Sequence, residues 1–132
     1  MRTLVALVFA TVVALPALAQ QPPARPETRL QQVVTGMPRG ERQEIQLLTA
    51  TIAPGQSTPF HTHRFPVTVL VLEGTFTLEM EGHPTAVVPA GGSMVEPPNV
   101  RMTGYNRHAT EPARVVIFYV ADPGTPFLDV AH

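Results

Sequence analysis

The stretch that decides the fold reads Gly55-Gln-Ser-Thr-Pro-Phe-His61-Thr-His63-Arg-Phe-Pro-Val67-Thr-Val-Leu-Val-Leu-Glu73-Gly74. His61 and His63 are separated by one residue, and residues i and i+2 of a β-strand point to the same face. Two imidazoles side by side predict two ligands of one metal ion. Two ordinary polar residues near the start of a strand would give the same pattern, so the flanking sequence has to decide.

The N-terminus predicts an export signal. Arg2 supplies a positive charge, residues 4–15 are apolar, and Ala17-Leu-Ala19 is a small-x-small cleavage site. The apolar run is shorter than the ~20 residues that span a bilayer, which disfavours a membrane anchor. We therefore expect a signal peptide over residues 1–19, cleavage near Ala19-Gln20, and a periplasmic or secreted protein with no membrane contact after cleavage.

Composition narrows the function classes. The chain has 132 residues, no cysteine and a formal net charge of -1, which becomes -2 when Arg2 leaves with the signal peptide. This charge is not that of a nucleic-acid-binding protein, and we expect no nucleic-acid partner. Without cysteine, the chain has neither disulfides nor thiolate metal ligands.

The mature chain predicts one all-β domain. The residues that follow the signal peptide, 20–28, are polar and proline-rich, which predicts a flexible leader, and residues 124–132 are expected to form an extended tail. The whole chain has fifteen prolines and nine glycines, and most of them separate short strand candidates between these two segments. The candidates cover residues 29–35, 44–53, 60–63, 67–72, 75–81, 85–88, 93–96, 100–106 and 113–121. About nine strands at this spacing, with no long helix, predict a sandwich or a barrel over residues 29–123.

The opening stretch resembles the first motif of the cupin family, which is Gly, five residues, His-x-His, three or four residues, Glu, six residues, Gly. Gly55, His61, His63 and Gly74 fall in register with this motif. Val67 stands where the family has its glutamate.

A second stretch resembles the other cupin motif, which is Gly, five residues, Pro-x-Gly, two residues, His, three residues, Asn. Gly91, Pro97 and Asn106 match it, whereas Asn99 stands at the second glycine and Met102 at the histidine. Asparagine tolerates a positive φ better than most residues, so the exchange at Asn99 is mild. The exchange at Met102 alters the chemistry.

The resemblance runs from about residue 29 to residue 123 and implies a fold. It implies a cupin jelly-roll, or double-stranded β-helix, barrel of the RmlC-like kind with a divalent metal ion inside one end. The family's metal is iron, manganese, nickel, zinc or copper, and its members are often homodimers. A homodimer is therefore expected here, with residues 124–130 either crossing to the partner or fraying.

Only two of the family's four metal ligands carry over, namely His61 and His63. Met102 can ligate through its thioether sulfur, and a soft sulfur beside two imidazoles favours copper. Alternatively, Met102 only fills the core, and the site binds metal weakly or not at all. A third possibility is a metal ion completed by Glu96 or Thr68.

The cavity beside the histidines is expected to be apolar. The two-residue period that turns His61 and His63 inward also predicts that Val67 and Val69 line the pocket. Phe65 is a candidate cover for its mouth, and Tyr105 is a candidate hydrogen-bond donor or acid.

Three functions remain open from the sequence. The first is an exported barrel that binds a metal ion, a small molecule or both at a degenerate site. The second is a metal-dependent oxygenase or isomerase of the cupin type. The third is a metal-free binding or structural barrel that retains the two histidines without using them.

Overall fold

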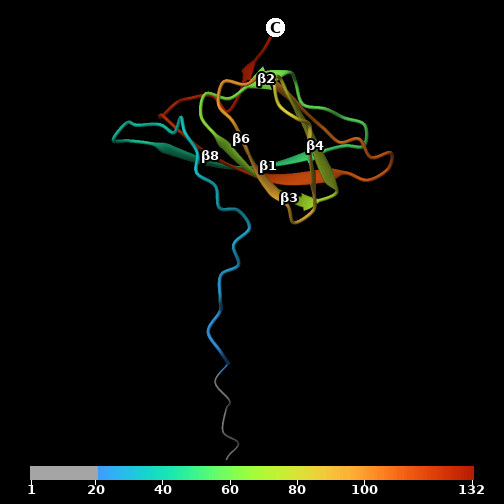
Figure 1. Ribbon diagram of the computed structural model, residues 1–132, viewed down its shortest axis with the longest axis horizontal. Helices are drawn as coiled ribbons and strands as arrows, with labels where there is room; N and C mark the ends of the chain where they lie inside the picture. The colour runs from blue at the N-terminus through green and yellow to red at the C-terminus, as the bar shows by residue number, and fades with distance from the viewer. Residues whose placement is uncertain (1–20) are drawn as a thin grey trace, which may run out of the picture.

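The chain folds into short strands joined by turns, as the glycine and proline spacing predicts (Figure 1). The computed structural model describes residues 21–132, so the predicted signal peptide over residues 1–19 lies outside the described residues. Within them, the strands are β1 (Glu44–Ile52), β2 (His61–Thr62), β3 (Val67–Glu73), β4 (Thr75–Met80), β5 (Ala86–Pro89), β6 (Ser93–Glu96), β7 (Met102–Tyr105), β8 (Ala113–Ala121) and β9 (Asp129–Val130). Residues 21–132 contain no helix long and apolar enough to cross a membrane.

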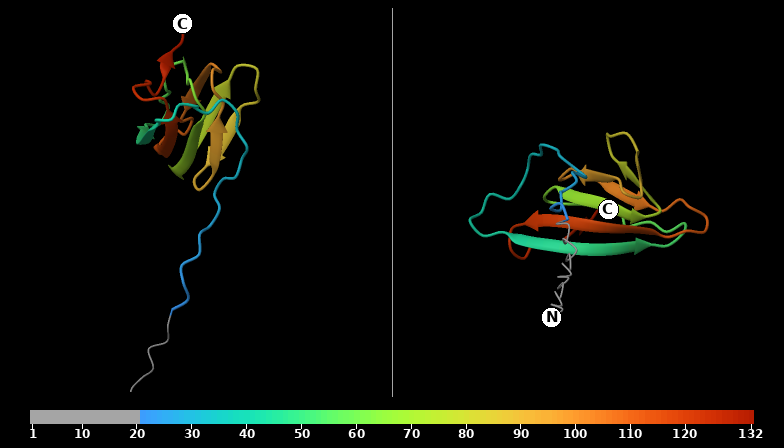
Figure 2. Two further views of the ribbon diagram at one scale, coloured as in Figure 1. Left: turned by 90° about the vertical axis from the view of Figure 1, so that its left-hand side faces the viewer. Right: turned by 90° about the horizontal axis from the view of Figure 1, so that it is seen from below.

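Two antiparallel sheets face each other and enclose the core (Figure 2). One sheet has the order β1-β8-β3-β6, and the other has the order β5-β4-β7-β2-β9. Every strand pair in both sheets is antiparallel. The all-β jelly-roll architecture predicted from the sequence is therefore confirmed.

Alternating side chains explain why each sheet has one buried face. In β8, residues at odd positions are buried and those between them are half-buried or exposed. In β3, Val67, Val69 and Val71 are at most 2% exposed, as the two-residue period predicts. The core is therefore built from the inward rows of both sheets.

The strand predicted over residues 29–35 is wrong. This segment has no ladder partner, and Val33 within it is 96% exposed, so its apolar residues do not share one buried face. The segment instead runs along the outside of the first sheet, where the Ser93 hydroxyl donates a hydrogen bond to the carbonyl of Arg29. The ninth strand lies at the other end of the chain, in the predicted tail.

The C-terminal segment folds back onto its own barrel. Its strand β9 pairs with β2, and Asp129 accepts two hydrogen bonds from the guanidinium of Arg64 at 2.8 and 2.9 Å. This segment was expected to cross to a partner or to fray. In the structure it completes the second sheet next to the two histidines.

Two turn positions require a left-handed backbone. Asn99 has a φ of 60°, a left-handed conformation that asparagine tolerates better than most residues. Gly74 has a φ of 70°, and a Cβ atom there would lie 2.4 Å from the carbonyl oxygen of Pro112. Gly74 is therefore needed both for its conformation and for close packing against the start of β8.

Gly74→Ala should destabilise the protein more than Gly82→Ala. Both glycines have φ near +70°, but nothing lies within 4 Å of a Cβ atom at Gly82. The change at Gly82 should cost only the backbone strain, about 1 kcal/mol, whereas Gly74→Ala should cost roughly 3 kcal/mol or more. Urea unfolding of both variants measures the difference, and equal costs would show that the contact with Pro112 is unimportant.

Candidate metal centre

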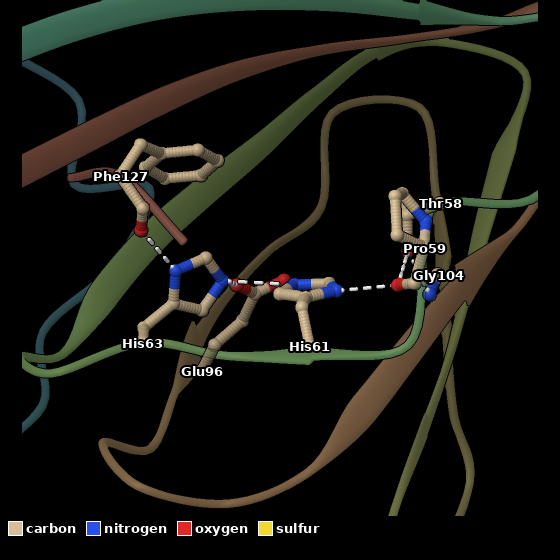
Figure 3. A network of polar contacts seen from close by, with 7 residues as sticks. All are labelled: Thr58, Pro59, His61, His63, Glu96, Gly104 and Phe127. Atoms are coloured by element: carbon tan, nitrogen blue, oxygen red, sulfur yellow. Dashed lines mark hydrogen bonds and ion pairs between the residues drawn. The ribbon is translucent and has the colours of Figure 1, made fainter. Parts of the chain in front are cut away.

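Strand β2 and the residue after it turn two imidazoles into the barrel. His61 and His63 are 4% and 1% exposed, and their ring centroids lie 4.7 Å apart with the rings nearly perpendicular. The Nε2 atom of His61 lies 3.1 Å from the Nε2 atom of His63 (Figure 3). The predicted side-by-side arrangement of the two histidines is therefore present.

Backbone carbonyl groups determine which ring nitrogen carries the hydrogen. Nδ1 of His61 lies 2.7 Å from the carbonyl oxygen of Pro59, and Nδ1 of His63 lies 2.6 Å from that of Phe127. A carbonyl oxygen can only accept a hydrogen bond, so both Nδ1 atoms must be protonated. In the neutral rings, both Nε2 atoms then present lone pairs toward each other.

A buried carboxylate lies beside the two facing nitrogens. Glu96 is 5% exposed, and its Oε2 atom lies 3.1 Å from Nε2 of His63 (Figure 3). Two neutral imidazoles and a carboxylate would place three acceptors together with no hydrogen between them. The arrangement requires either an added proton or a cation.

Burial disfavours the proton at one of the two rings. The pKa of His61 lies below its usual value of 6.5, mainly because burial penalises the imidazolium. The positive charge that a protonated His63 would carry lowers it further, whereas the hydrogen bond to Pro59 and the charge of Glu96 oppose the shift. His61 is therefore held toward the neutral form, which is the form that binds metal ions.

Glu96 lies directly across the sheet from the position where the cupin motif places its glutamate. Val67 occupies that position, and in the β3–β6 ladder its cross-strand partner is Glu96. Directly opposed residues project to the same face with Cβ atoms about 4.5–5.5 Å apart. The carboxylate absent from β3 is therefore supplied to the same region by β6.

The three groups form a chain of contacts with His63 in the middle. Among residues 21–132, no group of three or more His, Asp or Glu side chains is placed, in the arrangement observed, so that it could hold a metal ion. The contacts from His63 Nε2 to His61 and to Glu96 are both 3.1 Å.

Two other predicted ligand candidates do not line the cavity next to the histidines. Met102 is 1% exposed and is the register partner of His61, but it packs in the apolar core and is not among the residues that line the cavity. Thr68 was a wrong candidate, because it faces the outside of the first sheet beside Leu30 and Phe118. Its inward neighbours on β3 are the two valines at positions 67 and 69.

A cavity of about 200 Å³ adjoins the histidines and Glu96. Val69 lines it as predicted, whereas Val67 and Phe65 pack in or against the core and are not among its lining residues. Tyr105 was wrongly placed in the cavity. It lies on the outer side of its sheet, where the guanidinium of Arg107 sits over its ring at 4.8 Å.

The C-terminal segment supplies the site residues that the sequence did not reveal. Phe127 and Leu128 line the cavity, and the ring of Phe127 lies 4.7 Å from that of His63 between centroids. A two-residue strand has no periodicity to detect, and β9 forms only because β2 offers it an edge. The apolar pair Phe127-Leu128 was the one sign in the sequence that this segment packs against the barrel.

The family match agrees with the fold and the site. The family model of the cupin domain matches residues 48–119, which is more than half of the chain. The chain therefore belongs to the cupin family. No curated protein matches it.

Solved structures with a similar fold are only distantly related in sequence. The DMSP lyase DddQ from Ruegeria pomeroyi DSS-3 is 21% identical, with a TM-score of 0.58 over 66% of this chain and 43% of that chain. The polyketide cyclase RemF from Streptomyces resistomycificus is 22% identical, with a TM-score of 0.54 over 67% and 61%. An uncharacterized conserved protein with a double-stranded β-helix domain from Klebsiella pneumoniae is 19% identical, with a TM-score of 0.57 over 76% and 90%. The chain spans less than half of the lyase's length, and these likenesses show the fold alone.

Metal-free protein should lose stability as the pH falls from about 6.5 through the lowered pKa of His61. In that range the unfolded chain binds a proton that the folded chain resists, so the free energy of unfolding decreases. Above it, both states are neutral at this position and the contribution is constant. Urea unfolding with a chelator between about pH 5 and 8 should show a shallower pH slope for His61→Asn than for wild type. Identical slopes in the two proteins would contradict the shift.

Proposed function

We propose that this cupin domain binds a divalent metal ion through Nε2 of His61, Nε2 of His63 and the carboxylate of Glu96. The observation that carries the proposal is the set of three buried acceptors, with contacts of 3.1 Å and no hydrogen to share when the rings are neutral. Both histidines are already held in the required tautomer by backbone carbonyls. The site therefore offers lone pairs where a cation would complete it.

The contact distances support one shared ion. Nitrogen and oxygen ligands lie about 2.1 Å from zinc, so neighbouring ligands of one ion are roughly 3.0–3.4 Å apart. The two 3.1 Å contacts of His63 Nε2 fall in this range. A hydrogen-bonded chain gives similar distances, but only with an extra proton among the three buried groups.

The donor set favours a borderline metal ion. Two imidazoles and one carboxylate are typical ligands of zinc and of non-haem iron, and imidazole also suits copper and nickel. Copper is preferred only if Met102 ligates, and Met102 does not line the cavity. A bound ion would supply Lewis acidity, or redox chemistry if it is iron, copper or manganese.

An enzymatic role is the second candidate. The cavity reaches the two histidines and Glu96 directly, so a small molecule inside it could approach the proposed ion. Structural neighbours include a DMSP lyase and a polyketide cyclase, which shows that similar barrels occur in enzymes. We propose a metal-dependent reaction only as an extension of metal binding, because no substrate follows from the fold.

Export and dimer formation remain part of the proposal. The N-terminal sequence supports cleavage near Ala19-Gln20 and a periplasmic or secreted location. The outer face of the first sheet supports a homodimer, because Ile45, Leu47 and Phe118 are 67%, 72% and 43% exposed there. A second copy could cover these apolar side chains.

Purified protein should take up about one equivalent of Co²⁺ or Zn²⁺. His61→Ala and Glu96→Gln should each weaken this binding at least tenfold, because each removes one donor while the other two remain. Metal analysis after gel filtration, together with the visible absorption of bound Co²⁺, measures the effect.

Two variants serve as controls for this experiment. His83→Ala removes an exposed imidazole from a turn and should leave binding unchanged. Met102→Leu should also retain the metal. Loss of the metal in this variant would instead show that Met102 is a ligand, and copper would then be the preferred ion. Failure of the wild-type protein to bind any of the divalent ions would leave the metal-free barrel as the remaining function.

A further inference from the structure

We infer that the cavity beside the metal centre binds a compact apolar molecule that ends in a single anionic oxygen group. The inference rests on the proposed metal site and concerns what lies next to it.

The wall is formed by carbon from both sheets. Ala50, Val69 and Ile117 contribute from the first sheet, and Phe76 and Leu78 contribute from the second. No Arg or Lys lines this cavity among the described residues. A ligand with several hydroxyl groups would lose its hydration without gaining partners along this wall.

The one hydroxyl group at the cavity is already engaged. Oγ1 of Thr58 accepts a hydrogen bond from the backbone N–H of Gly104 at 2.9 Å and lies within donating distance, 3.1 Å, of the carbonyl of Pro59. The polar side chains that remain are His61, His63 and Glu96, all at the metal end. A matching ligand therefore carries its polar atoms at one end only.

The volume limits the size of the ligand. A dry cavity of about 150 Å³ holds benzene, and this cavity measures about 200 Å³. One six-membered ring with one small substituent fits this space, whereas two fused rings do not. Each methylene that such a ligand buries should raise its affinity about fourfold.

The charge of the site selects the polar end of the ligand. A divalent ion and the carboxylate of Glu96 leave one net positive charge in an apolar enclosure. A monoanionic oxygen donor neutralises that charge, while a cation or a dianion leaves an uncompensated one. Benzoate combines the required size, apolar body and single carboxylate, and it serves as the probe.

The test titrates Co²⁺-loaded protein with three carboxylates. Benzoate should bind with one-to-one stoichiometry and change the visible absorption of Co²⁺. Gluconate, which carries several hydroxyls, should bind at least ~100-fold more weakly, because its hydroxyls find no partners. The fused-ring 2-naphthoate should bind at least ~tenfold more weakly than benzoate.

Variants of the wall test the size limit without touching the metal ligands. Ala50→Leu should weaken benzoate at least ~tenfold with unchanged Co²⁺ content, because three carbon atoms are added to the cavity. Thr49→Leu adds the same side chain to the exposed face of the same strand and is the matched control. Ile117→Ala enlarges the cavity and should improve 2-naphthoate binding. If Ile117→Ala folds poorly, Ala50→Leu still tests the size limit.

The outcomes separate this inference from the proposed function. Protein that binds no Co²⁺ overturns the metal centre and this inference together. Protein that binds Co²⁺ but does not bind benzoate, or binds gluconate equally well, overturns the inference alone. Equal benzoate affinity in wild type and Ala50→Leu would show that the ligand does not enter the cavity.

Discussion

Two backbone carbonyl groups determine what the buried histidines can do. Each accepts a hydrogen bond from an Nδ1 atom, which leaves both Nε2 lone pairs directed into the barrel. One carbonyl belongs to Pro59, two residues before His61, and forms with the local turn. The other belongs to Phe127, sixty-four residues after His63, and reaches it only when β9 pairs with β2. Pairing of β9 with β2 therefore also orients His63, and the ion pair of Arg64 with Asp129 supports that pairing.

The register between β3 and β6 shows that the site has a carboxylate although the cupin motif lacks its glutamate. In the sequence, Val67 stands where the motif has a glutamate, so the motif lacks one metal ligand. Across the sheet, Glu96 stands opposite Val67 and brings a carboxylate to His63. In an antiparallel ladder these two positions are nearest neighbours on the same face. A carboxylate on either strand therefore reaches nearly the same place. A sequence motif cannot show this equivalence, because its spacing counts residues along the chain and not pairs across the sheet.

The sequence predicted most of the fold because hydrophobic alternation determines strands locally. The inward turn of the histidines and of Val67 and Val69 followed from the two-residue period alone. The same period places Tyr105 outside once Met102 is known to face inward, so that error came from considering the residue by itself. Phe127 could not be predicted, since its role depends on a two-residue strand that exists only through pairing. The strand predicted over residues 29–35 was wrong because apolar residues alone do not make a strand. This segment pairs with no neighbouring strand.

Charge balance is the physical basis of the proposed metal centre. Glu96 is 5% exposed, and the cavity beside it contains no arginine or lysine among the described residues. A buried carboxylate without a positive partner is strongly unfavourable, and either a proton held among the three groups or a metal ion would remove that cost. A proton on a ring would place an imidazolium beside a second buried imidazole, and burial already lowers the pKa of His61. In the proposed metal centre, a divalent ion would use all three lone pairs at once and would leave a single net charge, which an anionic ligand entering from the apolar side would neutralise.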